Sequence, residues 1–337
     1  MYSMPKFAII ILNWNGEALL ERYLPSVIAY SGDTPVYVAD NASTDGSVAF
    51  LQQHYPRVKI IRNSVNGGFA KGYNDALKEV DAEVYCLLNS DVEVSPGWLE
   101  PVERLMERHP EAAIVQPKVL DLLNKDRFEY AGAAGGFLDQ LGYPFCRGRI
   151  FQVLEQDQGQ YDDETEIFWA TGACMFIRSD IYWALGGFDE SYFAHQEEID
   201  LCWRAKNQGY KVFYTGHSTV YHLGGSTLSN MNPRKTYLNF RNSLYSITKN
   251  LPGKRVFAVI LFRLLLDFVA ALRFVFQGKW KHSFAIVHAH LSYYQNFKSM
   301  YGKRKKAIFV KNYYKTTSIV WSHFVHHINR FNDLVKD

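Results

Sequence analysis

Short apolar runs alternate with amphipathic stretches along the first third of the chain. The amphipathic stretches repeat their apolar residues at helical spacing, whereas the apolar runs have the length and composition of buried strands. Strands that alternate with helices in this way predict a doubly wound parallel sheet. The predicted strands cover residues 6–13, 35–40, 57–62, 82–89 and 112–116, and the predicted helices cover residues 17–30, 45–54, 69–79 and 96–109.

Polar residues and glycine follow the predicted strands at their carboxyl ends. Ligands of open α/β sheets bind beyond this edge, although the same residue types also make ordinary turns. The pattern therefore predicts a pocket at this edge without fixing its ligand. The residues at the strand ends are Asn13-Trp14-Asn15, Asp40 to Ser47, Asn63 to Gly68, and Asn89-Ser90-Asp91.

A glycine turn, Asn66-Gly67-Gly68-Phe69, precedes one of the predicted helices. The free amides at such a helix start favour phosphate, but the turn is equally typical of a helix start without a ligand. The spacing differs from the dinucleotide fingerprint G-x-G-x-x-G, and the chain has no P-loop.

The pattern is less regular after residue 116, and two polar segments of this region need an explanation. Residues 197–209 predict a helix whose first turn holds Glu197, Glu198 and Asp200. Acids in a first turn complement the helix dipole without any catalysis. Similarly, His222 ends an apolar run and is explained by an ordinary strand end. Neither segment by itself establishes chemistry.

Residues 256–276 are almost entirely apolar but contain Arg263, Asp267 and Arg273. The stretch is long enough to span a bilayer, yet each charge at the membrane centre would cost about 2.5–3.5 kcal/mol. On a helix these charges and Gln277 form one narrow polar stripe. We therefore expect the helix to lie in a membrane interface or to dock on protein, either the catalytic domain or a second subunit.

Charge is divided unevenly between two parts of the chain. Residues 251–337 hold 15 Lys and Arg against 3 Asp and Glu, whereas residues 1–250 hold 22 against 31. Such a basic segment predicts an anionic partner, either nucleic acid or a membrane. The apolar and aromatic residues around Lys303-Arg304-Lys305-Lys306 favour lipid headgroups, so we expect membrane association and no nucleic acid.

Length and composition predict one large domain with an appendage. The chain has 337 residues, of which 47% are hydrophobic, enough for one extensive core. We expect a catalytic domain over residues 1–250 and a helical extension over residues 251–337. The first apolar run is too short for a signal-peptide core, which favours the cytosol. The four cysteines form no C-x-x-C pair and are expected to be reduced.

Eight short segments, taken in chain order, are informative together: Ile9 to Asn15, Asp40 to Ser47, Asn66 to Ala70, Leu87 to Asp91, Thr171-Gly172-Ala173, Gly187 to Glu190, Glu197 to Leu201, and Tyr221-His222. This ordered set resembles the family 2 glycosyltransferases, and most closely their bacterial rhamnosyltransferase-like branch, which builds cell-surface polysaccharides. The resemblance implies an inverting transferase of the GT-A fold, an α/β fold with a mainly parallel, Rossmann-like sheet, here with a C-terminal helical extension. It also implies that the catalytic domain has a nucleotide-binding half (1–116) and an acceptor-binding half (117–250). The resemblance fades after about residue 245.

The resemblance also implies a role for individual residues. Asp91 and His222 would bind Mn²⁺ or Mg²⁺, and Glu198 would be the catalytic base. The donor would be a nucleotide-diphosphate sugar linked to UDP or dTDP, and the acceptor a saccharide or a lipid-linked saccharide. The nucleotide sugar would contact Asn13, Trp14, Asp40, Asn66, Gly67, Gly68, Phe69, Asn74, Asn89 and Ser90; the donor sugar and the acceptor would contact Thr171, Gly172, Ala173 and Glu197.

Two positions depart from the pattern of the family. Asn89 replaces the first acid of the DxD motif, and Glu198 stands where the base is usually an aspartate. The longer side chain matters because a misplacement of about 1 Å can reduce catalysis strongly. Glu197 and Asp200 therefore remain alternatives for the base.

The residue types suit a single displacement at the anomeric carbon. A divalent metal would stabilise the charge that develops on the departing diphosphate, and a carboxylate would accept the proton of the attacking hydroxyl. No enzyme nucleophile is needed, which agrees with the absence of a G-x-S-x-G motif.

Two other functions remain open. A sugar nucleotidyltransferase would need a cationic, glycine-rich loop after the first strand, and Asn13-Trp14-Asn15-Gly16 carries no cation. A degenerate transferase could instead serve as a membrane scaffold or a glycan-binding module. Whether the transferase is active or degenerate, we expect a cytoplasmic protein that is peripheral to the inner face of the cell membrane and capable of forming a homodimer.

Overall fold

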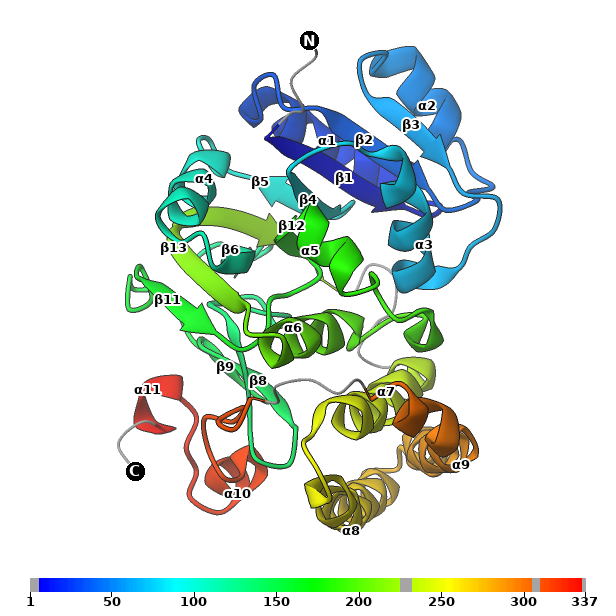
Figure 1. The fold of residues 1–337 in the computed structure, drawn as a ribbon, viewed down its shortest axis with the longest axis vertical. Helices are drawn as coiled ribbons and strands as arrows, with labels where there is room; N and C mark the ends of the chain where they lie inside the picture. Colours follow the sequence, from blue (N-terminus) through cyan, green and yellow to red (C-terminus); the bar gives the residue numbers. More distant parts are fainter. Residues whose placement is uncertain (1–5, 225–231, 305–309, 335–337) are drawn as a thin grey trace.

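The computed structural model describes residues 6–224, 232–304 and 310–334. Within them, a nine-stranded sheet with helices on both faces forms the centre of the molecule, and C-terminal helices lie beside one end of it (Figure 1). In spatial order the strands are β11 (Glu164–Ile167), β13 (Lys211–His222), β6 (Ala112–Asp121), β12 (Cys174–Arg178), β4 (Val84–Asn89), β1 (Phe7–Asn13), β2 (Val36–Asp40) and β3 (Lys59–Arg62), while β5 (Val92–Val94) pairs with β13.

The apolar runs form strands that are buried on both faces. Ala8 and Ile10 of β1 belong to one core cluster, and Ile9 and Ile11 belong to the other. This burial on both sides explains why the strands are continuously apolar instead of alternating. Helices α1 (Glu17–Tyr30), α2 (Ser47–His54) and α4 (Leu99–Arg108) cover one face; α3 (Gly68–Ala76), α5 (Ser179–Ala184) and α6 (Glu197–Asn207) cover the other.

The predicted helices and strands are confirmed to within a few residues, and the sheet is mainly parallel, as expected, with antiparallel strands beyond β4. Strands β4, β1, β2 and β3 are parallel neighbours. Strand β12 is inserted antiparallel between β4 and β6, and β13 runs parallel to β6. Since two antiparallel steps restore the direction, the carboxyl ends of β4 and β13 reach the same edge of the sheet.

A small second sheet and the C-terminal helices complete the structure. Ile260 and Tyr293 of these helices share a core cluster with Ile10 of the first strand. The division at residue 250 stays a prediction. The elements are β7 (Gly136–Leu138), β8 (Pro144–Cys146), β9 (Arg149–Ile150) and β10 (Val153–Leu154), followed by α7 (Pro233–Asn250), α8 (Arg255–Phe276), α9 (Trp280–Gly302), α10 (Ile319–Phe324) and α11 (Phe331–Leu334).

The polar stripe that the sequence predicts on α8 divides in two. Arg263 donates to Ser243 Oγ (2.9 Å), and Asp267 accepts from the Tyr143 hydroxyl (2.7 Å), so this part docks on the protein. The remaining two polar side chains, Arg273 and Gln277, are exposed. In the described part of the chain, no helix combines the length and apolarity that crossing a bilayer requires.

Candidate active site

The sheet topology brings Asp91 and His222 together, although they lie far apart in the sequence. His222 is the last residue of β13, and its register partner on β5 is Val92, the residue after Asp91. The imidazole Nε2 of His222 lies 3.1 Å from Oδ1 of Asp91 and 3.4 Å from the amide nitrogen of Asn89. Both Asp91 and His222 are buried. An oxygen ligand and a nitrogen ligand therefore meet at the carboxyl edge of the sheet.

Glu129, which the sequence did not single out, lies on the other side of the imidazole. Its carboxylate is 3.5 Å from Nδ1 of His222, and it also accepts from the amide of Ala131. A carboxylate behind a ligating histidine fixes the ring orientation and strengthens the other nitrogen as a ligand. The sequence gives little indication of Glu129, because this residue precedes the irregular glycine-rich segment. There, neither helix nor strand periodicity indicates which side chains point inward.

The electrostatics of this cluster are compatible with a divalent cation. Burial lowers the pKa of His222, but Asp91 and Glu129 outweigh burial and raise it to about 10. The cationic ring thus balances two carboxylates, and a metal could take the place of its proton. Among the described residues no group of three or more His, Cys, Asp or Glu side chains is arranged to hold a metal. Two side chains still fit Mg²⁺ or Mn²⁺, because such ions commonly take their other ligands from substrate phosphates and water.

The ends of β1 and β2 form a second polar group at the same edge. Asn13 is buried and donates to Asp40 Oδ1 (3.4 Å) and Ser43 Oγ (3.3 Å), and Ser43 in turn donates its amide to Asp40 Oδ2 (3.1 Å). The carbonyl oxygen of the Asn13 side chain has no hydrogen-bond partner among the described residues. Trp14 is 49% exposed, so its ring is available to a planar ligand.

The glycine turn is packed so tightly that its glycines are required. Asn66 Oδ1 accepts from the amide of Gly68 (3.0 Å), which has φ of +79°. A Cβ at Gly68 would lie 2.4 Å from the carbonyl oxygen of Phe193, which accepts from the amide of Phe69 (2.7 Å). The turn that contains Gly67 therefore lies directly against the loop that leads into α6.

Asn74 lies in the core and not at the edge of the sheet. Its Oδ1 accepts from the Tyr182 hydroxyl (2.6 Å) and the Phe188 amide (2.9 Å), and its Nδ2 donates to the Phe188 carbonyl (2.9 Å) and to Glu190 (3.2 Å). These contacts occupy both ends of the amide. Asn74 thus joins α3 to the loop after α5.

Thr171, Gly172 and Ala173 connect the glycine turn to the end of β4. The carbonyl of Ala173 accepts from the amide of Asn89 (3.0 Å), next to Ser90. A Cβ at Gly172 would lie 3.0 Å from the ring of Phe69. Gln116 holds the segment by accepting from the amide of Thr171 (2.8 Å). The predicted sugar and acceptor residues therefore adjoin both the glycine turn and the Asp91 cluster.

The start of α6 combines strained backbone with unpaired carboxylates. Phe193, His195 and Gln196 have φ of 64°, 69° and 73°, a region that L-residues other than Asn and Asp seldom adopt and that is enriched at functional sites. Oε2 of Glu197 and of Glu198 are buried and have no hydrogen-bond partner among the described residues.

Burial sets the protonation of these two glutamates. It raises the pKa of Glu198 to about 7 and, with the charge of Glu198, raises the pKa of Glu197 further. A carboxylate with a pKa near the operating pH suits a general base. The helix also adjoins the segment that contains Thr171, because Cys202 Sγ accepts from the amide of Ala170 (3.4 Å).

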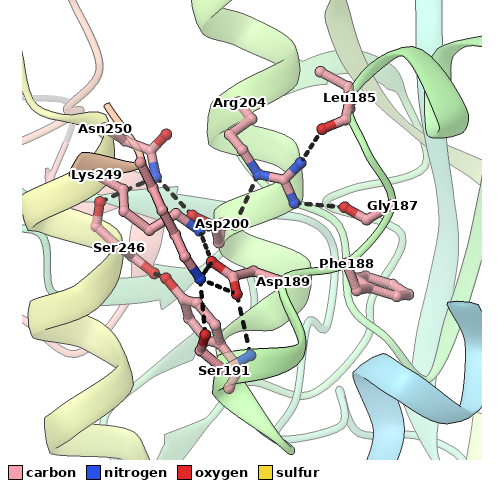
Figure 2. Close-up of polar contacts among 12 residues, drawn as sticks. Leu185, Gly187, Phe188, Asp189, Ser191, Asp200, Arg204, Ser246, Lys249 and Asn250 are labelled. Atoms are coloured by element: carbon pink, nitrogen blue, oxygen red, sulfur yellow. Dashed lines mark hydrogen bonds and ion pairs between the residues drawn. The ribbon is translucent and has the colours of Figure 1, made fainter. Parts of the chain in front are cut away.

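Asp200, the third acid of this helix, is committed to ion pairs. Figure 2 shows its carboxylate between Arg204 on α6 and Lys249 and Asn250 on α7, each at 2.8 Å. Burial raises its pKa, but Lys249 and Arg204 outweigh burial and lower it. These cations keep Asp200 in its charged form. It anchors α7 to the helix that carries Glu198.

Comparison with known proteins gives a consistent result. The model of glycosyl transferase family 2 matches residues 8–186. The N-acetylglucosaminyl-diphospho-decaprenol L-rhamnosyltransferase of Mycobacterium tuberculosis is 27% identical over 233 residues, which is 64% of this chain and 75% of that protein. The O-antigen biosynthesis protein RfbC of Myxococcus xanthus is 27% identical over 226 residues, 65% of this chain but 17% of that longer protein.

A solved structure extends the similarity to the fold. The mannosyltransferase PcManGT of Pyrobaculum calidifontis, in complex with GDP-Man and Mn²⁺, superposes with a TM-score of 0.55 at 13% sequence identity. The similarity covers 87% of this chain and 88% of that one.

Proposed function

The chain belongs to glycosyltransferase family 2 and has the GT-A fold, and on that basis we propose that it is a metal-dependent, inverting transferase that uses a nucleotide-diphosphate sugar. The observation that carries the proposal is the contact of Asp91 with His222 at the carboxyl edge of the sheet, 3.1 Å apart. Strands β4 and β13 do not need a buried acid and a histidine at this point in order to fold. A metal that binds a diphosphate does need such ligands.

We propose that Asp91 and His222 hold Mn²⁺ or Mg²⁺, which would supply Lewis-acid stabilisation of the leaving diphosphate. Glu129 keeps Nε2 of His222 directed at Asp91 through its contact with Nδ1, 3.5 Å away. Asn89 and Ser90 frame the same turn. The Mn²⁺ in the PcManGT complex supports this part of the proposal, because that protein shares the fold.

The donor nucleotide is proposed to occupy the edge formed by β1, β2 and the glycine turn. Asp40 accepts hydrogen bonds from the base or ribose, with Asn13 and Trp14 beside it. The turn Asn66-Gly67-Gly68-Phe69 lies next to the nucleotide. Asn74 supports this pocket from the core instead of contacting the donor, because its amide is fully engaged.

Glu198 is proposed as the base of the transfer. The acceptor oxygen forms a bond to the anomeric carbon while the bond from that carbon to the diphosphate oxygen breaks. The hydroxyl proton passes to Glu198, and the nucleoside diphosphate leaves. One displacement inverts the anomeric centre. The donor sugar lies beside Thr171, Gly172 and Ala173. The acceptor lies next to Glu197.

The acceptor is proposed to be a saccharide on a lipid carrier, reached from the cytoplasmic face of the membrane. The relative from Mycobacterium tuberculosis acts, by its name, on a diphospho-decaprenol-linked sugar. A rhamnosyl or hexosyl group from a UDP- or dTDP-linked donor would fit the same branch of the family.

The proposal predicts that Asp91→Ala removes metal-dependent donor binding. Calorimetric titration of UDP- and dTDP-sugars should give an affinity that requires Mn²⁺, and the variant should lose at least about tenfold of it because one of two protein ligands is gone. Asp33→Ala changes an exposed turn before β2 and serves as the matched control, with unchanged affinity.

Two results would count against the proposal in different ways. Equal Mn²⁺-dependent affinity in Asp91→Ala and in the native protein would remove the metal site. If the protein binds a donor tightly but neither hydrolyses nor transfers the sugar of any of the UDP- and dTDP-sugars tested, it is instead a degenerate protein that binds sugar nucleotides.

A further inference from the structure

Helix α8 buries the two central charges of its polar stripe and leaves most of its large apolar side chains exposed. Arg263 and Asp267 are 1% and 0% exposed, held by Ser243, Tyr143 and His290. The opposite side carries large apolar side chains, for example Leu261, Phe268 and Phe276, which are 59%, 60% and 87% exposed. An amphipathic helix of a water-soluble protein packs the other way round.

Helix α9 continues this surface. Trp280, Phe284, Val287, Leu291 and Tyr294 are all exposed and recur at helical spacing. Phe257 near the start of α8 lies beside Tyr301 near the end of α9, with ring centroids 6.0 Å apart. We refer to the exposed apolar side chains of α8 and α9 together as the apolar face. Soluble monomers seldom expose contiguous apolar patches of this extent without a partner.

Exposed cations lie at both ends of the apolar face. Lys254 and Arg255 lie at the start of α8, Lys279 and Lys281 lie at the turn into α9, and Lys298 is on α9. Lys254 and Arg255 also line a hollow with Lys311, Asn312 and Tyr314. A concave group of three cations beside apolar side chains has the chemistry to hold an anionic headgroup.

Two residues of the basic run expected to meet headgroups, Lys303 and Arg304, are bound within the protein. Lys303 bonds to Asp189 (2.7 Å), and Arg304 donates to the carbonyls of Thr248 and Leu251. These two side chains therefore tie the helices to the catalytic domain. Lys305 and Lys306 lie outside the described residues. The exposed cations at the ends of the apolar face can contact headgroups in place of Lys303 and Arg304.

We propose that the apolar face rests on an anionic lipid bilayer, with α8 and α9 lying in the interface and the hollow at Lys254 and Arg255 holding a phosphate-bearing headgroup. Aromatic side chains such as Trp280 and Tyr294 favour this depth. The proposed function has a lipid-linked acceptor, and this proposal places the protein on the membrane that holds such an acceptor. To that extent it rests on the proposed function.

Charge distinguishes the bilayer from a second copy of the chain. Between residues 251 and 332 the sequence has one acid, Asp267, and it is buried against His290. A twofold interface would bury this patch against its own copy, which carries the same cations and no carboxylate to balance them. An anionic membrane balances them directly.

Vesicle flotation tests the proposal with the full chain. We expect binding to vesicles of phosphatidylglycerol and phosphatidylcholine, weaker binding to pure phosphatidylcholine, and a decrease at high salt. Leu261→Ser/Phe268→Ser should weaken binding at least about tenfold, because two large apolar side chains no longer enter the lipid. Lys254→Glu/Arg255→Glu should weaken binding to the anionic vesicles only.

Matched controls exclude a general effect of surface change. Leu123→Ser removes an exposed apolar side chain of the catalytic domain, and Arg57→Glu reverses an exposed cation there; neither should change flotation. Circular dichroism should show native folding of all four variants, since the altered side chains are exposed.

Three outcomes would overturn the proposal. The first is equal flotation of Leu261→Ser/Phe268→Ser and the native chain, and the second is no flotation of either. The third is a dimer of the native chain in lipid-free sedimentation that is absent in the double variant, which would identify a second copy of the chain as the occupant of the apolar face. The readout needs no sugar donor. A soluble acceptor analogue tests the transferase separately, so the two proposals fail independently.

Discussion

The two residues that depart from the family pattern have neighbours that explain them. Asn89 places its amide 3.4 Å from Nε2 of His222. A carboxylate there would add a third negative charge to an imidazole that already faces Asp91 and Glu129. Glu198 sits behind a strained loop, where burial raises its pKa to about 7. Its reach and its basicity thus depend on backbone geometry that no sequence pattern indicates.

We predict that Glu198→Gln abolishes transfer while donor affinity stays within about twofold, because the amide cannot accept the proton. In the native enzyme the base must be deprotonated, so the rate of transfer should rise with pH and level off above about 7, the pKa of Glu198. Steady-state rates across this range, with calorimetry of the donor, measure both effects.

Glu197→Gln is the matched control for the base. It removes the adjacent buried carboxyl and should retain transfer with an unchanged pH midpoint, because the pKa of Glu197 is raised further and this carboxyl is protonated while Glu198 titrates. Full turnover in Glu198→Gln together with loss in Glu197→Gln would reverse the assignment. Since burial raises the pKa of Glu198 in the folded state, Glu198→Gln should be at least as stable as the native protein at neutral pH.

At the scale of elements, periodicity predicts which segments form helices and strands but not how they are oriented. The predicted helix 17–30 matches α1, because its apolar positions repeat every three to four residues. The antiparallel insertion of β12 had no signal, since strand direction leaves no trace in local hydropathy. Likewise, the polar stripe of α8 was visible in the sequence, but its inward direction depends on distant partners, Tyr143 and Ser243.

The join between α6 and α7 gives an element-scale prediction. Lys249 is buried and pairs with Asp189 (2.6 Å) and Asp200 (2.8 Å) (Figure 2). Lys249→Met removes the buried cation that both carboxylates share and leaves Asp200 with Arg204 and Asp189 with Lys303, so we expect a loss at the lower end of about 3–5 kcal/mol in unfolding free energy. Lys303→Met removes a partly exposed ion pair to the same Asp189 and should cost about 0–1 kcal/mol.

The pH dependence of that loss follows from the two aspartates. Burial raises the pKa of Asp189 and Asp200, but Lys249 and the other cations outweigh it, so both values lie below the ordinary one. Their stabilisation is complete above the unfolded pKa of about 3.9 and decreases as pH falls toward the folded values. Denaturant unfolding should therefore show a smaller effect of Lys249→Met at about pH 3 than at about pH 7; a constant difference would contradict the ion-pair explanation.

At the scale of the molecule, the site is assembled from segments that the sequence leaves far apart. Asp91 and His222 were identified as partners through a resemblance, whereas Glu129 was missed and Asn74 was assigned to the donor although it supports the core. Motifs report the residues that touch ligands, and the side chains that hold those residues vary with the local packing. The same limit applies to the tail: composition marked it as an appendage, yet Phe331 packs against Phe137 and Phe145 beneath the small sheet.

This packing predicts that the catalytic domain and the C-terminal segment unfold together. Phe331 is buried, and its amide also donates to Glu155 (3.2 Å). Phe331→Ala should therefore lower the free energy of unfolding of the whole chain by about 3–5 kcal/mol and shift a single calorimetric transition. Phe324→Ala removes the same side chain where it is 43% exposed and should cost less than about 1 kcal/mol. Two separate transitions, with Phe331→Ala moving only one, would show that the tail is an independent unit, and a deletion at residue 250 would then leave a folded transferase.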